Sequence, residues 1–277
     1  EFDPVLVHDW LRRSARRFPD KEALIYDQQR WTYRMLDCHT DYMAKVLLDM
    51  GIDHQDRVVI FLDNSPETVI SLYGILKARG VFVILDGSVK KSKLKYILKN
   101  CGAKVMITHT SKARVVEGAL ADADNDCKAI IWVGPEKAIP ENLLAISRTW
   151  HSIFSNLNRK GNATYVETSG ELPRGIDVDL SCLIYTSGST GEPKGVMSTH
   201  HNMISAARSI IQYIGNEEDD IILNVLPLSF DYGLYQIIMA FMFGGTVVLE
   251  KSFIYLHDIL QRIAPVSYTH LTLPTKA

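Results

Sequence analysis

The feature that most constrains this chain is a regular alternation of short, almost entirely apolar segments with longer amphipathic ones. Residues 57–62, Arg-Val-Val-Ile-Phe-Leu, form one such apolar run, and a helix expected over residues 66–78 follows it. Strands that are apolar along their whole length are typical of parallel sheets covered by helices on both faces. The sequence therefore predicts a doubly wound α/β fold, with mostly parallel sheets and flanking helices.

The same criteria give the remaining elements. Helices are expected over residues 5–18, 33–50, 93–100, 113–121, 201–214, 232–243 and 254–263. Strands are expected over residues 23–26, 31–32, 81–85, 104–108, 129–133, 180–185, 195–199, 221–226 and 246–249. Between residues 135 and 177, prolines, glycines and a polar stretch interrupt the alternation. This interruption predicts a surface excursion around one helix.

Composition excludes several classes of protein. The chain of 277 residues is 47% hydrophobic and 22% charged, with a net charge of −2, as in ordinary soluble globular proteins. This balance indicates neither a nucleic-acid-binding surface nor a polybasic membrane anchor. The most apolar stretch, residues 235–249, is too short to cross a bilayer, so we expect no membrane span.

The cysteines lie far apart in the sequence and form no CxxC pair; they are Cys38, Cys101, Cys127 and Cys182. This spacing argues against a zinc ribbon and provides no disulfide framework. It therefore favours a reducing, cytoplasmic setting.

The most informative segment, residues 185–196, lies between two predicted strands and reads Tyr-Thr-Ser-Gly-Ser-Thr-Gly-Glu-Pro-Lys-Gly-Val. Its glycines let backbone N–H groups converge on an anion, its hydroxyl groups add donors, and Lys194 adds a positive charge. It is not a Walker P-loop, because Pro193 stands where that motif requires glycine. A flexible surface turn has a similar composition. The lysine, the flanking strands and the order of the residues favour a loop that wraps a polyphosphate.

This segment resembles the phosphate loop of the adenylate-forming, AMP-binding superfamily, which includes acyl-CoA synthetases, peptide-synthetase adenylation domains and luciferases. Three further segments resemble elements of that family in the expected order, namely residues 31–36, 64–67 and 76–86. In the last of these, Arg79 stands where the family usually has glycine and Ile84 where it usually has proline. These departures raise a question about local packing. The similarity covers about residues 11–264 and is greatest to an acyl-CoA synthetase.

The resemblance implies an ATP-dependent ligase. A carboxylic acid attacks the α-phosphate of ATP, with Mg²⁺ as cofactor, to give an acyl adenylate and pyrophosphate, and CoA is the expected acceptor of the acyl group. The residues that the resemblance assigns to the ATP phosphates are Thr186, Ser187, Gly188, Ser189, Thr190, Gly191 and Lys194. Two alternatives stay open. One is a peptide-synthetase adenylation domain that activates an amino acid for a carrier protein, and the other is a non-catalytic nucleotide-binding remnant.

A second segment, residues 227–233, resembles the border of the acyl or aminoacyl pocket in this family. It gives four pocket candidates, Phe230, Asp231, Tyr232 and Gly233. In amino-acid-activating members an aspartate here pairs with the α-amino group of the substrate. Asp231 is also well placed to cap the helix expected after it, which is the interpretation that we favour. Phe230 and Tyr232 suit either a hydrophobic core or a pocket wall, and the Tyr-Gly pair is more like acyl-CoA ligases.

Two other features receive simpler interpretations. His200 and His201 are adjacent, whereas histidines that share a metal on a helix need a spacing of about three or four residues, so we predict no metal site. The resemblance puts this pair near the active-site cleft, so a role in the pocket stays open. The lysine-rich run over residues 90–95 is expected to be a solvated helix face.

We expect residues 1–264 to be the N-terminal part of an AMP-binding domain. Residues 266–275 have no counterpart in the family pattern and look like an in-frame translation of a transposase-adaptor sequence, so residues 265–277 are expected to be a non-native read-through tail. The family's Y-G-x-T-E element, ribose-binding aspartate and C-terminal lid subdomain with its catalytic lysine also have no counterpart. We therefore assign no catalytic residue and expect the truncated chain not to complete adenylation.

Overall fold

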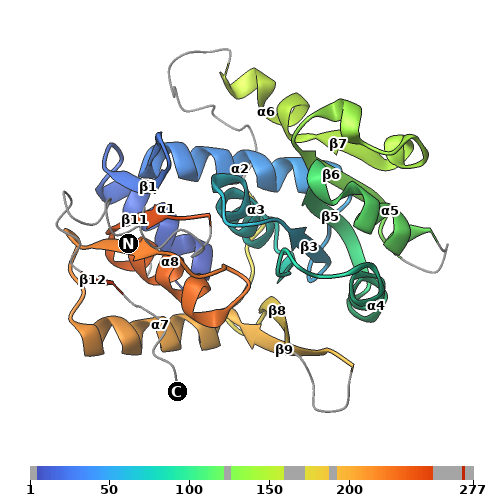
Figure 1. The fold of residues 1–277 in the computed structure, drawn as a ribbon. Helices are drawn as coiled ribbons and strands as arrows, with labels where there is room; N and C mark the ends of the chain where they lie inside the picture. The colour runs from blue at the N-terminus through green and yellow to red at the C-terminus, as the bar shows by residue number, and fades with distance from the viewer. Residues whose placement is uncertain (1–4, 122–125, 159–171, 187–191, 252–269, 272–277) are drawn as a thin grey trace. The chain divides into compact units, whose positions relative to one another are not determined.

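A computed structural model describes residues 5–121, 126–158, 172–186, 192–251 and 270–271 (Figure 1). The chain divides into two compact units. Unit 1 comprises residues 1–37, 63–66 and 200–277, and unit 2 comprises residues 38–62 and 67–199. Each unit contains its own β-sheet.

Unit 2 contains a seven-stranded sheet with the strand order β7-β6-β5-β3-β4-β8-β9. Its strands are β3 (Arg57–Phe61), β4 (Val81–Ile84), β5 (Ala103–His109), β6 (Ala129–Val133), β7 (Ser147–Thr149), β8 (Leu180–Thr186) and β9 (Lys194–Thr199). Neighbouring strands are parallel except β8 and β9, which are antiparallel. The parallel strands need crossover connections, and the helices provide them.

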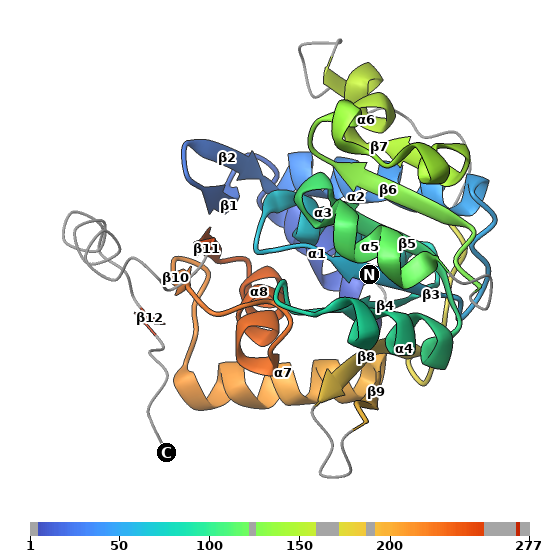
Figure 2. The ribbon, with the colours of Figure 1, turned by 45° about the vertical axis from the view of Figure 1, so that its right-hand side comes forward.

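The helices of unit 2 cover both faces of this sheet. Figure 2 shows α4 and α5 on one face, with α3 on the other. The elements are the C-terminal part of α2 (Tyr33–Asp49), then α3 (Pro66–Lys77), α4 (Lys91–Cys101), η1 (Thr110–Lys112), α5 (Ala113–Leu120), η2 (Glu136–Ala138), η3 (Glu141–Ile146) and α6 (Trp150–Asn158).

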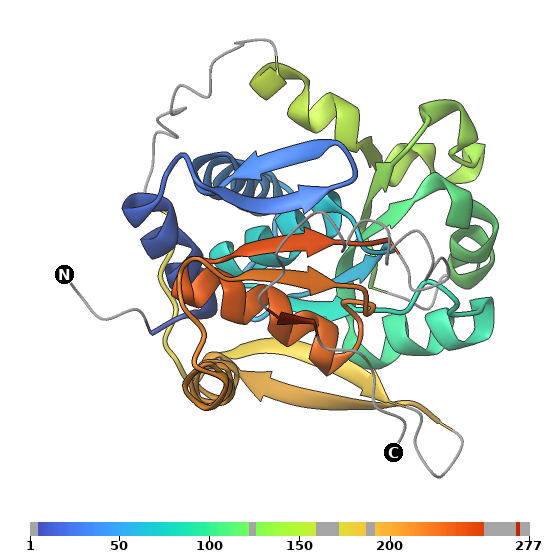
Figure 3. The same ribbon diagram turned by 60° about the vertical axis from the view of Figure 1, so that its left-hand side comes forward.

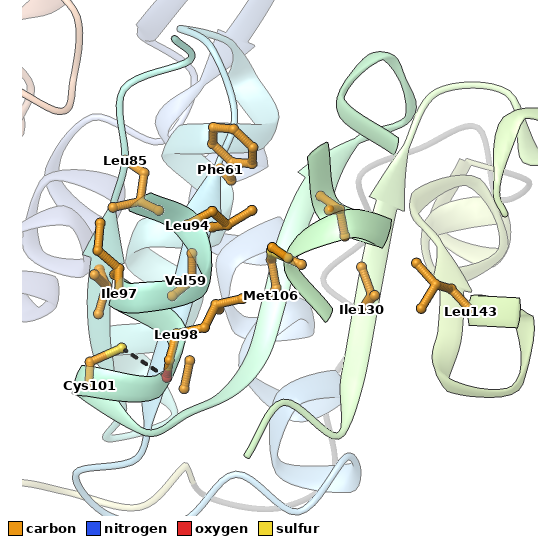
Figure 4. Packing of buried hydrophobic residues seen from close by; sticks show 14 of the residues in the cluster. Val59, Phe61, Leu85, Leu94, Ile97, Leu98, Cys101, Met106, Ile130 and Leu143 are labelled. Atoms are coloured by element: carbon orange, nitrogen blue, oxygen red, sulfur yellow. Dashed lines mark hydrogen bonds between the residues drawn. The ribbon is translucent and has the colours of Figure 1, made fainter. Parts of the chain in front are cut away.

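One hydrophobic core cluster of unit 2 lies between the sheet and helices α4 and α5 (Figure 4). Val59 and Phe61 are two residues apart on β3 and face the core together, because side chains alternate along a strand. Leu94 and Ile97 face it from α4, at the spacing of one helical side. Full burial of such a side chain stabilises the fold by about 1.5–3 kcal/mol. The apolar positions of α4 therefore fix which side of this helix meets the sheet.

Unit 1 contains a five-stranded sheet with the order β12-β10-β11-β1-β2. Its strands are β1 (Glu22–Tyr26), β2 (Gln29–Thr32), β10 (Ile221–Asn224), β11 (Thr246–Leu249) and β12 (His270–Leu271). Unit 1 also contains helices α1 (Val7–Arg17), α7 (His200–Ile214) and α8 (Asp231–Phe243). Helix α8 packs on strands β10 and β11 (Figure 3). The buried Tyr33 hydroxyl donates to the Gly245 carbonyl at 2.6 Å, which ties the start of α2 to the turn before β11.

The predicted fold class is confirmed, since both sheets are mainly parallel and carry helices. Two strand pairs, β1–β2 and β8–β9, are antiparallel. The prediction of mostly parallel sheets did not say which strands would pair in this way. The excursion over residues 135–177 contributes an edge strand, β7, in addition to one helix. The predicted helix over residues 254–263 lies outside the described residues, and β12 lies within the predicted tail. Among the described residues, no helix is long and apolar enough to cross a membrane.

Candidate functional site

The segment predicted to bind phosphate forms a β-hairpin at the edge of the unit 2 sheet. Strands β8 and β9 run side by side in opposite directions, with Thr186 opposite Lys194 and Tyr185 opposite Gly195 (Figure 1). Both Thr186 and Lys194 are exposed. A hydroxyl group and an ammonium group thus stand on facing residues at the end of β8 and the start of β9, an arrangement that suits a phosphate ligand.

The rest of the predicted phosphate-binding set lies outside the described residues. It comprises Ser187, Gly188, Ser189, Thr190 and Gly191. The described part of the site therefore consists of strands β8 and β9, which are the two arms of the hairpin, and of the residues that hold these strands.

The arm that ends β8 is anchored to helix α4. Burial raises the pKa of the Tyr185 hydroxyl, which stays protonated and donates to Asn100 Oδ1 at 2.5 Å. A Cβ atom at Gly195 would lie 3.2 Å from Tyr185 Cζ, so the facing strand passes close over the tyrosine ring. The missing side chain at Gly195 thus leaves room for the Tyr185 ring on this face of the hairpin.

The arm that enters β9 also contacts α4. Burial and a hydrogen bond to the Glu192 carboxylate raise the pKa of the Tyr96 hydroxyl. Tyr96 and Asn100 are four residues apart on α4, so they share one side of the helix. Neither residue could be predicted as part of the site from the sequence, because a polar position on a helix carries no sign of the strand that it contacts.

The predicted pocket segment lies in unit 1, between β10 and α8. The prediction that Asp231 caps α8 is wrong. The N-cap residue is Phe230, no side chain caps the helix, and Asp231 is its first residue. The chain enters the helix one residue earlier than expected, and the Asp231 carboxylate is exposed near the positive end of the helix dipole.

The other pocket candidates divide into exposed and buried residues. Phe230 is 58% exposed and Tyr232 is 77% exposed, so neither belongs to the hydrophobic core of the described residues. Gly233 is buried, and a Cβ atom there would lie 2.4 Å from the Pro227 carbonyl oxygen. The glycine is therefore needed where α8 passes close to the backbone of the loop that precedes it.

The two histidines have different environments. His200 is buried, and its Nδ1 accepts a hydrogen bond from the Val7 N–H at 3.1 Å, so this nitrogen is engaged by the start of α1. The His200 ring also meets that of His8 edge-on, with 5.7 Å between centroids. His201 is exposed on the first turn of α7. The described residues contain no group of three or more metal-ligating side chains.

The chain matches one family of known proteins. The model of the AMP-binding enzyme family matches residues 11–276. Bacitracin synthase 1 of Bacillus licheniformis is 30% identical over 243 residues, which cover 88% of this chain and 4% of that protein.

Solved structures agree with this match. A complex of VinN with 3-methylaspartate is 25% identical with a TM-score of 0.75, and the alignment covers 94% of this chain and 64% of VinN. The anthranilate CoA ligase AuaEII, in complex with anthranoyl-AMP, shares the fold at 23% identity and a TM-score of 0.81, over 96% of this chain and 49% of the ligase. This chain spans less than two thirds of the length of each of these relatives.

Proposed function

We propose that this chain, which belongs to the family of AMP-binding enzymes, supplies the phosphate-binding hairpin and the pocket segment of a ligase that activates a carboxylic acid with ATP. The observation that carries the proposal is the pairing of Thr186 with Lys194, the two described residues that flank the glycine- and hydroxyl-rich part of the sequence. Such a loop offers converging donors and one positive charge, which fits the β- and γ-phosphates of ATP.

The chemistry that this assignment implies is a displacement at phosphorus. An oxygen of the substrate carboxylate forms a bond to the α-phosphorus, and the bond to the bridging oxygen breaks. The acyl adenylate then remains and pyrophosphate leaves. Two anions must approach each other, so Lys194 and the loop donors would neutralise charge on the leaving group, and Mg²⁺ would add to this neutralisation. A thiol then takes the acyl group and AMP leaves.

The proposal is tested by pyrophosphate release from the product of the gene, assayed with ATP and a panel of fatty, aromatic and amino acids. We expect release that depends on one class of acid, together with binding of a non-hydrolysable acyl-adenylate analogue. Failure of every acid to trigger release, combined with no binding of the analogue, would leave this assignment without support.

A second candidate function differs in the acid and in the acceptor. The Asp231 carboxylate is exposed and does not cap α8, so it is available to pair with an α-amino group. This favours an amino acid as substrate and a carrier protein as acceptor, in place of a simple acid and CoA. Asp231→Asn separates the two functions. It should weaken activation of amino acids strongly, whereas activation of acids without an amino group should not change.

We further propose that the enzyme acts in a reducing, cytoplasmic setting. None of the cysteines in the described part of the chain forms a disulfide. Burial raises the pKa of Cys101 to about 11 and that of Cys127 to about 12, so both remain protonated and unreactive at neutral pH.

A further inference from the structure

We propose that Asn64 is a positioning residue that holds the pocket segment of unit 1 in place through its side-chain amide. This inference rests on the proposed function, because it takes Phe230, Asp231 and Tyr232 as the residues that meet the acid. It concerns the loop between β10 and α8, residues 225–230, and the short stretch of residues 63–66 that belongs to the same unit.

The Asn64 side chain makes three hydrogen bonds to backbone groups far away in the sequence. Its Nδ2 donates to the Leu226 carbonyl at 2.9 Å and to the Glu250 carbonyl at 3.0 Å. Its Oδ1 accepts the Leu228 N–H at 2.9 Å. Asn64 is only 5% exposed, so little water can replace these bonds. One amide group therefore joins the loop to the end of β11.

A second asparagine, at the end of the strand that precedes the loop, also bonds to the backbone of this segment. Asn224, at the end of β10, is buried, and its Oδ1 accepts the Leu226 N–H at 3.1 Å. Its Nδ2 donates to the Gly233 carbonyl at 2.8 Å. The loop is thus held on both sides of Leu226 and at the first turn of α8. Asn64 is the member of this set that comes from a different part of the chain.

Within this loop Val225 and Leu228 are buried, whereas the pocket candidates at its end are not. The side chains of Phe230, Asp231 and Tyr232 are exposed, so their positions follow from where the backbone is held. Buried backbone groups of an irregular loop require partners, and an asparagine amide supplies both a donor and an acceptor. Loss of Asn64 should therefore release the carbonyl of Leu226 and the N–H of Leu228, and with them the entry to α8.

The test compares Asn64→Asp with Asn142→Asp. The first change keeps one acceptor for Leu228 but removes both donor bonds and places a carboxylate against two carbonyl oxygens. Asn142, on the exposed η3 of unit 2, receives the same chemical change away from this loop. Asn64→Ser, which retains a hydroxyl donor, serves as the milder variant if Asn64→Asp does not fold.

Hydrogen exchange of the 277-residue chain gives the first readout. We expect exchange in residues 225–233 to rise about tenfold in the Asn64 variants, as when a buried group loses its partner, and to stay unchanged in Asn142→Asp. Protection unchanged in residues 225–233, or lost evenly throughout unit 1, would overturn the positioning role.

Turnover of the gene product gives the second readout. Asn64→Ser should raise KM for the acid while KM for ATP and kcat stay unchanged, a split that general destabilisation would not produce. An unchanged KM for the acid contradicts the inference. If the unaltered protein shows no acid-dependent turnover, the proposed function fails, and the exchange result still decides whether Asn64 holds the loop.

Discussion

The backbone N–H of Gly80 donates to the carbonyl of Ile75 at 2.9 Å and closes the C-terminus of α3 around Arg79. The Arg79 N–H donates to the Leu76 carbonyl at 3.1 Å, and the two bonds together form a Schellman motif. In this motif the residue before the last donor adopts a left-handed conformation, and Arg79 has φ of +63°. The family's usual glycine at this position is thereby explained, and the arginine is strained.

The first prediction is that Arg79→Gly stabilises unit 2. A left-handed conformation costs a residue with a Cβ atom about 1–2 kcal/mol, and the larger entropy of glycine in the unfolded chain cancels part of this. We expect a net gain of about 0.5–1 kcal/mol in the free energy of unfolding, measured by urea denaturation. Arg79→Ala keeps the Cβ atom and should show no gain. An equal gain in both variants would mean that the arginine side chain, and not the backbone, is the source.

A second prediction uses two glycines that lie in helices. Gly233→Ala would put its Cβ atom 2.4 Å from the Pro227 carbonyl oxygen, which is backbone and cannot move aside. We expect a loss of about 1–3 kcal/mol in the stability of unit 1, as for other overpacked sites. Gly118→Ala, in α5, meets only the flexible Lys91 side chain at 2.8 Å and gains helix propensity. It should be neutral or stabilising, and a similar loss in both variants would contradict the backbone argument.

The third prediction concerns the dependence of stability on pH. Burial alone would raise the pKa of Asp179, but the Ile176 N–H at 3.0 Å and the His54 side chain at 3.0 Å lower it below its usual value. A carboxyl whose pKa is lower in the folded state adds stability above its ordinary pKa of about 4 and loses it as the pH falls through the folded-state value.

Asp179→Asn should therefore be less stable than the unaltered protein at pH 7, and the difference should shrink as the pH falls below about 4. Urea denaturation at pH 7, 5, 4 and 3 measures the difference. Glu136→Gln, on the exposed η2, is the matched control and should give no such trend. A constant difference at every pH would show that the asparagine disturbs packing and that ionisation is not the cause.

The fourth prediction concerns the hairpin. In the product of the gene, Lys194→Ala should lower kcat/KM for ATP in acid-dependent pyrophosphate release by about a hundredfold, the size expected for one charged contact to a transition state. Lys90→Ala, which removes an exposed lysine elsewhere in unit 2, should have no effect. Equal rates in Lys194→Ala and the unaltered protein would remove the charged contact from the proposed mechanism.

The sequence by itself determined most of the helices and strands, and it predicted a phosphate ligand for residues 185–196, which stays a prediction. Strands β6 and β11 match the predicted ranges, and the other elements for which a range was predicted differ by a few residues at their ends where they are described. Strands β7 and β12 and the 3-10 helices had no predicted range. Apolar periodicity, caps and turns act over a few neighbouring residues, so they can be read locally. The order of the residues from Tyr185 to Lys194 can also be read locally, because donors, glycines and a lysine in one short segment suffice to suggest a phosphate ligand.

Only the tertiary structure decided which distant residues meet. Leu24 pairs with Val247, β9 turns back beside β8, and Asn64 reaches Leu226, and none of these contacts leaves a local pattern. Asp231 illustrates the same limit, since it is the first residue of α8 and not its N-cap, a difference of one residue that the local sequence did not fix. Strand partners and helix starts are selected by burial and by the demand of buried polar groups for partners, and both belong to the folded chain as a whole.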